Sequence, residues 1–165
     1  MNNKYALTDE AKMVSGHRLR RIKAVTDIGV YARAGQFGGW IEREENLSEY
    51  GDAWVSGEAQ VSGTAQIRGD ALVFGNASIT GNARVTGSAR VGDSAWVSDE
   101  AWVSDNALVS GKARVAGHAR VIDNAWIGDH AWVGGTVTIS GYARVGGHTR
   151  MEANEWISGD TKMPS

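Results

Sequence analysis

The sequence contains no cysteine among its 165 residues, which excludes disulfide scaffolds, thiolate zinc sites and cysteine nucleophiles. It has one proline, too few for a proline-rich disordered chain, and its 22 glycines do not follow the three-residue pattern of collagen. Only two residues are phenylalanine, and the apolar residues are mostly alanine and valine. We therefore expect no conventional core of leucine and phenylalanine.

Neither sign of charge is in large excess. The formal net charge is −2, which argues against a general binder of nucleic acid or other polyanions. No apolar run approaches the roughly 20 residues that a membrane span needs. The first twelve residues, MNNKYALTDEAK, are too polar for a secretory signal. We expect a soluble, cytoplasmic protein without membrane contact.

What the sequence does have is a six-residue repeat. From Gly51 to Ser158 it divides into eighteen consecutive hexapeptides with no insertion or deletion, beginning GDAWVS, GEAQVS, GTAQIR. The third position is alanine in fifteen units, and the fifth is valine or isoleucine in seventeen. The first position is glycine or aspartate in every unit except the last.

This spacing predicts strands rather than helices. Within each unit the third and fifth positions share one side of a short strand, so alanine and valine face inward. The two residues that follow each strand form a tight corner, where glycine, Asp and Asn tolerate unusual dihedral angles. A six-residue unit cannot bury its own apolar face and must stack into a solenoid.

The units VGDSAW, VIDNAW and IGDHAW resemble the hexapeptide-repeat family, and the resemblance covers about two thirds of the chain. It implies an all-β fold, a single-stranded left-handed parallel β-helix with three hexapeptides per triangular coil. Eighteen units would then form about six coils. The segment GGWIEREENLSEYG, from Gly38 to Gly51, is similar to the lead-in of bacterial and prophage (YdcK-like) hexapeptide proteins. These are often labelled transferases, although their function is largely unassigned.

The repeat suggests three segments: a small β cap over residues 1–50, the β-helix over 51–158 and a short tail or cap over 159–165. In the cap, alternation predicts strands at residues 18–25 and 30–33 and a loop at 35–39. We expect Trp40 and Ile41 to cover the open first coil, because an exposed coil would leave unpaired backbone groups that could pair with another chain.

If each residue stacks on the one eighteen positions later, the outward fourth positions form three faces. Face one carries Trp54, Leu72, Arg90, Leu108, Trp126 and Arg144. Face two carries Gln60, Ser78, Trp96, Arg114, Trp132 and Arg150. Face three carries Gln66, Arg84, Trp102, Arg120, Thr138 and Trp156.

Tryptophan and arginine alternate along face two, at Trp96, Arg114, Trp132 and Arg150, and Trp102 precedes Arg120 on face three. Guanidinium groups between indole planes form cation–π contacts that stabilise the coils. The alternative is a surface for a ligand or partner, with indole for a ring and arginine for a phosphate or carboxylate.

Face one has an apolar strip formed by Trp54, Leu72, Phe74, Leu108 and Trp126. Such a strip more often marks an interface than a free surface. Members of the resembled family commonly pack side by side, which implies a homo-oligomer, a dimer or a trimer.

The best-known members of that family are acyltransferases that use acyl-CoA and a histidine as general base. The matching residue types here are His118, His130 and His148, all at corner positions. Family members usually carry an extended loop that closes the acceptor pocket, and this repeat has none. We also expect no acidic residue to orient His118. A solvated corner histidine is the simpler interpretation of each.

Aspartate replaces the first-position glycine at residues 93, 99, 105, 123 and 129. Asp105 and Asp123 stack on one corner and could attract a divalent cation between coils. Acceptance of hydrogen bonds from turn amides is the commoner role of such aspartates. We predict no specific metal and no cofactor, with coenzyme A as a co-substrate only under the acyltransferase alternative.

These observations favour a rigid, non-catalytic protein that presents its Trp/Arg faces to a protein partner or a small ligand. The lead-in segment suggests a phage-encoded inhibitor or sequestering protein acting on a host system. The alternative is a trimeric acyltransferase with a corner histidine as base.

Overall fold

The structure, a computed structural model, describes residues 2–163. The chain begins with three strands, β1 (Tyr5–Val14), β2 (His17–Ala24) and β3 (Phe37–Ile41), and a 3₁₀ turn, η1 (Glu44–Asn46). Nineteen two-residue strands follow, β4 to β22, and they form three parallel sheets. Within the described residues, no helix has the length and apolar character needed to span a membrane.

The face-one sheet contains β4 (Trp54–Val55), β7 (Leu72–Val73), β10 (Arg90–Val91), β13 (Leu108–Val109), β16 (Trp126–Ile127), β19 (Arg144–Val145) and β22 (Lys162–Met163). The face-two sheet contains β1, β2, β3, β5 (Gln60–Val61), β8 (Ser78–Ile79), β11 (Trp96–Val97), β14 (Arg114–Val115), β17 (Trp132–Val133) and β20 (Arg150–Met151). The face-three sheet contains β6 (Gln66–Ile67), β9 (Arg84–Val85), β12 (Trp102–Val103), β15 (Arg120–Val121), β18 (Thr138–Ile139) and β21 (Trp156–Ile157).

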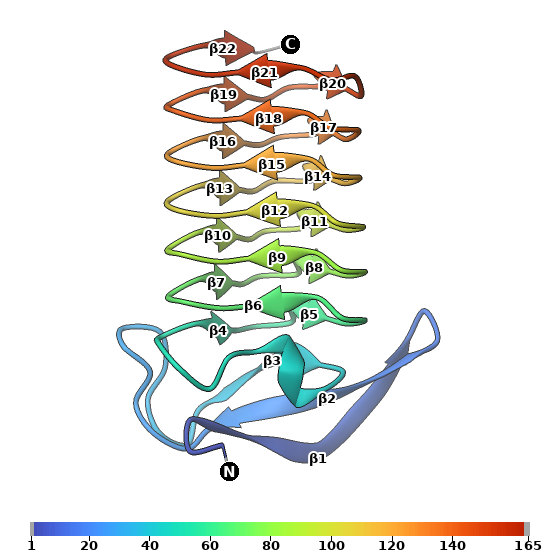
Figure 1. The fold of residues 1–165 in the computed structure, drawn as a ribbon. Coiled ribbons are helices and arrows are strands. Elements are labelled where there is room, and N and C mark those ends of the chain that lie inside the picture. Colours follow the sequence, from blue (N-terminus) through green and yellow to red (C-terminus); the bar gives the residue numbers. More distant parts are fainter. Residues whose placement is uncertain (1, 164–165) are drawn as a thin grey trace.

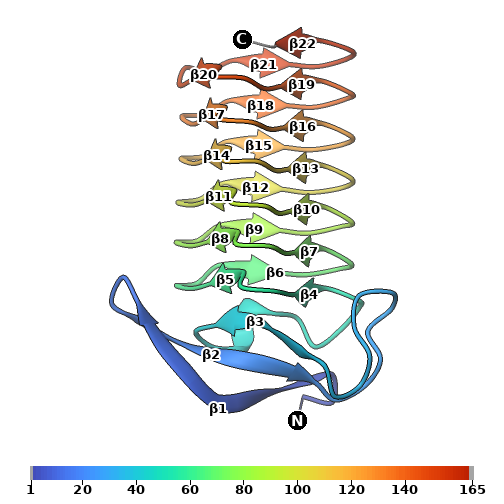
Figure 2. The same ribbon diagram turned by 180° about the vertical axis from the view of Figure 1, so that it is seen from behind.

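The strands stack into a prism in which each residue pairs with the residue eighteen positions later, such as Trp96 with Arg114. In Figure 1 the chain passes from β4 at the rear through β5 to β6 in front, and it runs leftward across the front as it climbs. This sense is left-handed, and the view from behind agrees (Figure 2). The predicted all-β, left-handed parallel β-helix is confirmed.

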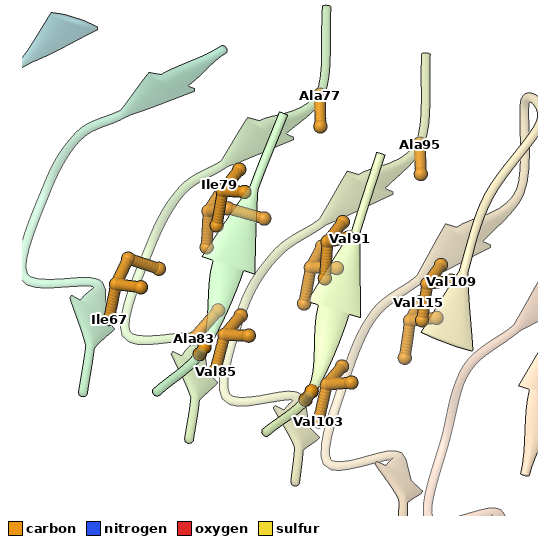
Figure 3. Packing of buried hydrophobic residues seen from close by; sticks show 14 of the residues in the cluster. Ile67, Ala77, Ile79, Ala83, Val85, Val91, Ala95, Val103, Val109 and Val115 are labelled. Carbon is orange, nitrogen blue, oxygen red and sulfur yellow. The ribbon is translucent and has the colours of Figure 1, made fainter. Parts of the chain in front are cut away.

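The interior consists of small aliphatic side chains. Every third and fifth position from Ala53 to Val145 is at most 1% exposed. Alanine and valine or isoleucine from the three sheets meet across the narrow axis (Figure 3). Backbone N–H groups on each coil donate to carbonyls on the next, as Trp96 does to Ala113 at 2.9 Å. The interior therefore holds the coils together, and the polar and aromatic side chains of the repeat lie on the outer surface.

The corners explain the glycine content. Gly57, Gly63 and the equivalent first positions have φ near +65°, a conformation that side chains with a Cβ rarely adopt. A Cβ at Gly63 would lie 2.9 Å from the backbone oxygen of Gly81 on the next coil. Corner glycines thus satisfy both the left-handed backbone and the close approach of neighbouring coils.

The cap extends the face-two sheet. β1 and β2 form an antiparallel hairpin, β2 pairs antiparallel with β3, and β3 pairs parallel with β5. Trp40 lies beside Gln60, as expected for a residue that covers the first coil. The parallel pairing starts at β3 and continues to β22, which pairs with β19, so the solenoid has about seven turns.

Two expectations for the cap were wrong. Residues 30–33 form no strand, since Ile28 and Ala32 make only an isolated bridge. The predicted loop at 35–39 overlaps β3, which begins at Phe37. The ten-residue β1 also went unpredicted, because its sequence YALTDEAKMV mixes polar and apolar residues without clear alternation.

Candidate ligand-binding surfaces

The exposed tryptophans lie on faces two and three. Trp96 is 43% exposed, Trp102 is 36% exposed and Trp156 is 76% exposed. They project from strands whose other residue is buried inside the prism, so the two-residue strand fixes the direction in which each indole points. The hexapeptide pattern alone therefore sets these aromatic groups on a rigid wall.

Arginine and tryptophan form separate pairs. The guanidinium carbon of Arg114 lies 5.1 Å from the ring centre of Trp96, and that of Arg150 lies 4.5 Å from Trp132. On face three, Arg120 lies 5.6 Å from Trp102. In each pair the arginine reaches the tryptophan one coil closer to the N-terminus. Face two thus carries two pairs and not the continuous stack that the alternation suggested.

A hydrogen bond fixes most of these indoles. The indole N–H of Trp102 donates to the Thr86 hydroxyl at 3.0 Å, and that of Trp126 donates to Ser110 at 3.1 Å. Trp96 and Trp156 make the same bond to Thr80 and Ser140. The acceptor is always sixteen residues earlier, at the sixth position of a hexapeptide in the preceding coil. Sequence reasoning missed this bond, although serine or threonine at that spacing signals it.

An open groove runs along face three beside Trp102. It has a volume of about 580 Å³. One wall is the corner column Thr64, Asn82, Glu100 and His118, and the other is the strand column Gln66, Arg84, Trp102 and Arg120. We call this the face-three groove. A smaller hollow of about 300 Å³ lies on the other side of Trp102 and Arg120, so these two side chains form a ridge between hollows.

His118 has an acidic partner in this groove, contrary to expectation. Its Nδ1 lies 3.0 Å from Oε2 of Glu100. The two residues are eighteen positions apart and so occupy the same corner on adjacent coils. The side chains are 65% and 58% exposed, so this contact is well solvated and contributes little to stability. The spacing was visible in the sequence.

The other two corner histidines lie together on a different corner. The rings of His130 and His148 stack with their centres 4.9 Å apart and an angle of 26° between their planes. Both residues are exposed. The structure thus separates His118, which has a carboxylate partner, from this stacked pair.

The corner aspartates accept hydrogen bonds from turn amides of the next coil. Asp99 Oδ2 accepts from the N–H of Gly117 at 2.9 Å, and Asp123 Oδ2 accepts from Gly141 at the same distance. Asp105, stacked below Asp123, accepts from its N–H at 3.2 Å. Within residues 2–163 no group of three or more His, Asp or Glu is arranged to hold a metal ion.

Face one is flatter than its sequence suggests. Trp54 is only 1% exposed, because the cap strand β3 lies against it and a Cβ at Gly38 would come within 2.6 Å of its ring. The Phe74 ring covers Gly92, and the Trp126 ring covers Gly128. Leu72 and Leu108 are half-buried. The exposed part of the apolar strip therefore starts at Leu72.

Shifted pKa values occur in the cap. Burial lowers the pKa of Lys4 to about 8, although Asp52 and Asp70 oppose the change, and its ammonium donates to the Ser48 carbonyl at 3.0 Å. Burial also raises the pKa of Tyr5, and the nearby Glu44 raises it further.

Glu42 joins the hairpin to the first coil. Its Oε2 lies 2.9 Å from Nδ1 of His17 and accepts the Gly63 N–H at 2.6 Å. Burial raises the pKa of Glu42, but these two hydrogen bonds outweigh it and leave the pKa below its ordinary value. These contacts hold the cap onto the first coil of the solenoid.

The geometry defines a parallel β-solenoid built of hexapeptide coils, with small aliphatic side chains inside and polar and aromatic side chains on the outer walls. Residues 77–93, just under one coil, match the family model described as the YdcK Beta solenoid repeat. This match and the fold confirm the resemblance to YdcK-like hexapeptide-repeat proteins. A comparison with curated proteins finds no match.

Proposed function

We propose that the protein is a non-catalytic binding protein whose Trp/Arg faces contact a partner. The observation that carries the proposal is the set of exposed indole–guanidinium pairs, Arg114 with Trp96, Arg150 with Trp132 and Arg120 with Trp102. Tryptophan and arginine are the residue types most enriched among the anchors of protein interfaces. A rigid wall loses little conformational entropy when it presents them.

The partner of this proposal is a protein, and its binding surface is face two, where the Arg114–Trp96 and Arg150–Trp132 pairs lie. The setting that we favour is inhibition or sequestration of a host component by a phage-encoded protein. Support for that setting comes from the similarity of residues 38–51 to prophage hexapeptide proteins. In this setting the protein acts by binding alone, so the interface residues determine how strongly it inhibits or sequesters its target.

The test is capture of partners from a native host lysate, followed by mass spectrometry. Arg114→Glu and Trp132→Ala should each reduce recovery of the same specific protein, because interface anchors of these types contribute about 1–3 kcal/mol. His130→Ala and His148→Ala are the controls, since they alter exposed side chains on the adjoining corner. Equal recovery with the parent and both face-two variants would contradict the proposal.

One observation favours a second candidate function, acyl transfer from acyl-CoA. Because Glu100 lies at Nδ1 of His118, the Nδ1–H can point at the carboxylate and leave Nε2 free to accept a proton. An acceptor hydroxyl in the face-three groove would be within reach of that nitrogen.

This candidate is tested by turnover. His118→Ala should abolish transfer from acetyl-CoA to an acceptor alcohol or amine, whereas His148→Ala on another corner should leave it unchanged. If the parent shows no turnover with any acceptor, or if His118→Ala retains the parent rate, acyl transfer through His118 is excluded.

A further inference from the structure

The face-three groove contains groups suited to one class of ligand, and we propose that it binds an acidic carbohydrate chain. This inference rests on the proposed binding function and adds a ligand for the second Trp/Arg face, face three. The groove is straight, open and parallel to the solenoid axis. From Thr64 to His118 it spans three coil steps, about 14 Å at the strand spacing of roughly 4.8 Å.

The corner wall offers hydrogen bonds of mixed type. Thr64 supplies a hydroxyl, Asn82 an amide, Glu100 a carboxylate and His118 an imidazole, one on each successive coil. The Thr64 hydroxyl contacts the Asn82 amide, and Glu100 contacts His118. Sugar hydroxyls both donate and accept hydrogen bonds, so a wall with donors and acceptors in alternation can satisfy them.

The strand wall alternates charge and ring. Arg84 precedes Trp102, and Arg120 follows it, so the backbone positions of the two arginines are two coils or about 10 Å apart. Within residues 2–163, neither arginine forms an ion pair, and the Arg84 side chain makes no hydrogen bond. Guanidinium groups bind carboxylates and sulfates in two-point contacts through their N–H edges. Arg84 can offer that edge directly, and Arg120 can offer it while its guanidinium carbon lies 5.6 Å from the ring centre of Trp102.

Trp102 lies between the two arginines as a fixed platform. Its indole N–H is already held by Thr86, the residue is 36% exposed, and the Arg120 guanidinium lies over one part of the ring. A broad aromatic face of this kind packs against the C–H face of a sugar ring. Because a sugar unit is about as long as one coil step, the order arginine, tryptophan, arginine fits a chain with an acidic group on every second sugar.

Two other polymers fit less well. The backbone groups of the wall are already paired between coils, as Arg84 N–H is with Ala101, so an extended peptide would find no sheet edge to join. A nucleic acid carries a charge on every unit, and the Glu100 carboxylate would face that dense negative charge. A glycan needs no sheet edge to bind, and a glycan with an acidic group on every second sugar has a lower charge density than a nucleic acid.

The experiment is calorimetric titration of the full chain with four six-unit probes. Hyaluronan hexasaccharide carries carboxylates on alternate sugars, and chondroitin sulfate hexasaccharide adds sulfates. Chitohexaose is the uncharged control, and hexaglutamate is the peptide control. We expect both acidic glycans to bind saturably, and the two neutral or peptide controls to bind at least tenfold more weakly. A preference between the acidic glycans shows whether carboxylate or sulfate is the natural group.

Arg84→Gln should weaken glycan binding about tenfold, as expected for loss of a charge-assisted contact, and Trp102→Ala should weaken it comparably. Arg144→Gln is the matched control, because Arg144 occupies the same repeat position on face one. Unchanged circular dichroism and melting temperature would show that the variants are folded.

Three results would overturn the inference: no saturable binding of either acidic glycan at millimolar concentration, equal binding of hexaglutamate, or equal weakening by Arg144→Gln. Partner capture by face two is measured separately with Arg114→Glu and Trp132→Ala. If the glycans do not bind but the face-two variants lose the protein partner, only the proposed ligand is wrong and the proposed function stands. If the face-two variants capture the partner as well as the parent does, the proposed function is contradicted.

Discussion

At the scale of single residues, the corner aspartates show how one side chain replaces glycine at a left-handed position. Asp93, Asp99 and Asp129 have φ between 53° and 59°, a region that costs most residues about 1–2 kcal/mol. Each offsets this cost by accepting a backbone N–H from the next coil. The carboxylate therefore joins coils as well as shaping the corner.

Substitution of Asp99 separates these two effects. Asp99→Gly keeps the backbone conformation and loses only the hydrogen bond to Gly117, at a cost of about 0.5–1.5 kcal/mol. Asp99→Ala loses the same bond and also retains a Cβ at positive φ, so it should be less stable than Asp99→Gly by about 1 kcal/mol. Urea denaturation measures both. An alanine variant as stable as the parent would contradict this explanation.

Lys4 should make stability depend on pH. Its pKa is about 8 in the folded chain and 10.5 in the unfolded chain, so the folded state binds fewer protons between these values. Stability should therefore rise by about 2 kcal/mol from pH 7.5 to 9.5. Above about pH 10, ionisation of Tyr5 in the unfolded state should reverse the trend, because its folded pKa is raised.

Lys4→Met removes this titration and should flatten the rise in unfolding free energy. Lys23→Met, an exposed lysine of the same cap, is the matched control and should keep the rise. A parent protein whose stability does not increase over this interval would show that the Lys4 ammonium is solvated.

At the scale of the structural element, the two-residue strand permits only a small residue on the inner side of each corner. Ala101 and Ala107 are 0% exposed and face an interior already filled by valine and isoleucine. Ala101→Leu and Ala107→Leu should each destabilise the solenoid by about 1–3 kcal/mol or more through overpacking. Ser94→Leu at an exposed corner is the control. If both interior variants have the same melting temperature as the parent, the assignment of inward-facing and outward-facing positions is wrong.

The elements also show what the sequence could and could not reveal. Period six determines which residues face inward, which stack eighteen apart and where left-handed corners occur, so the walls of the face-three groove follow from it. The pairing of His118 with Glu100 obeys the same rule and was available at that spacing. The burial of Trp54 was not available, because the strand that covers it belongs to the aperiodic cap. β1 was missed for the same reason, since residues 5–14 have no regular alternation of polar and apolar side chains.

At the scale of the whole molecule, a triangular prism has three flat walls, and its apolar wall is face one. We expect a dimer or trimer formed through Leu72, Phe74, Leu108 and Trp126, whose half-buried side chains lie beside flat glycine positions. Leu72→Glu and Leu108→Glu should dissociate it, because a buried unpaired charge costs several kcal/mol. Ser78→Glu, on face two, should not. Light scattering of the parent at high concentration that shows only a 17.6 kDa particle would contradict the interface.

The central claim is that this solenoid binds a partner through its walls and does not catalyse acyl transfer. Titration of the unmodified protein with coenzyme A, followed by calorimetry, tests the claim most directly. We predict no saturable heat up to millimolar coenzyme A, because His118 lies in an open groove and the repeat between Gly51 and Ser158 has no inserted loop to enclose a donor. Saturable binding of coenzyme A that persists in His118→Ala, together with loss of turnover in that variant, would contradict the claim and identify an acyltransferase.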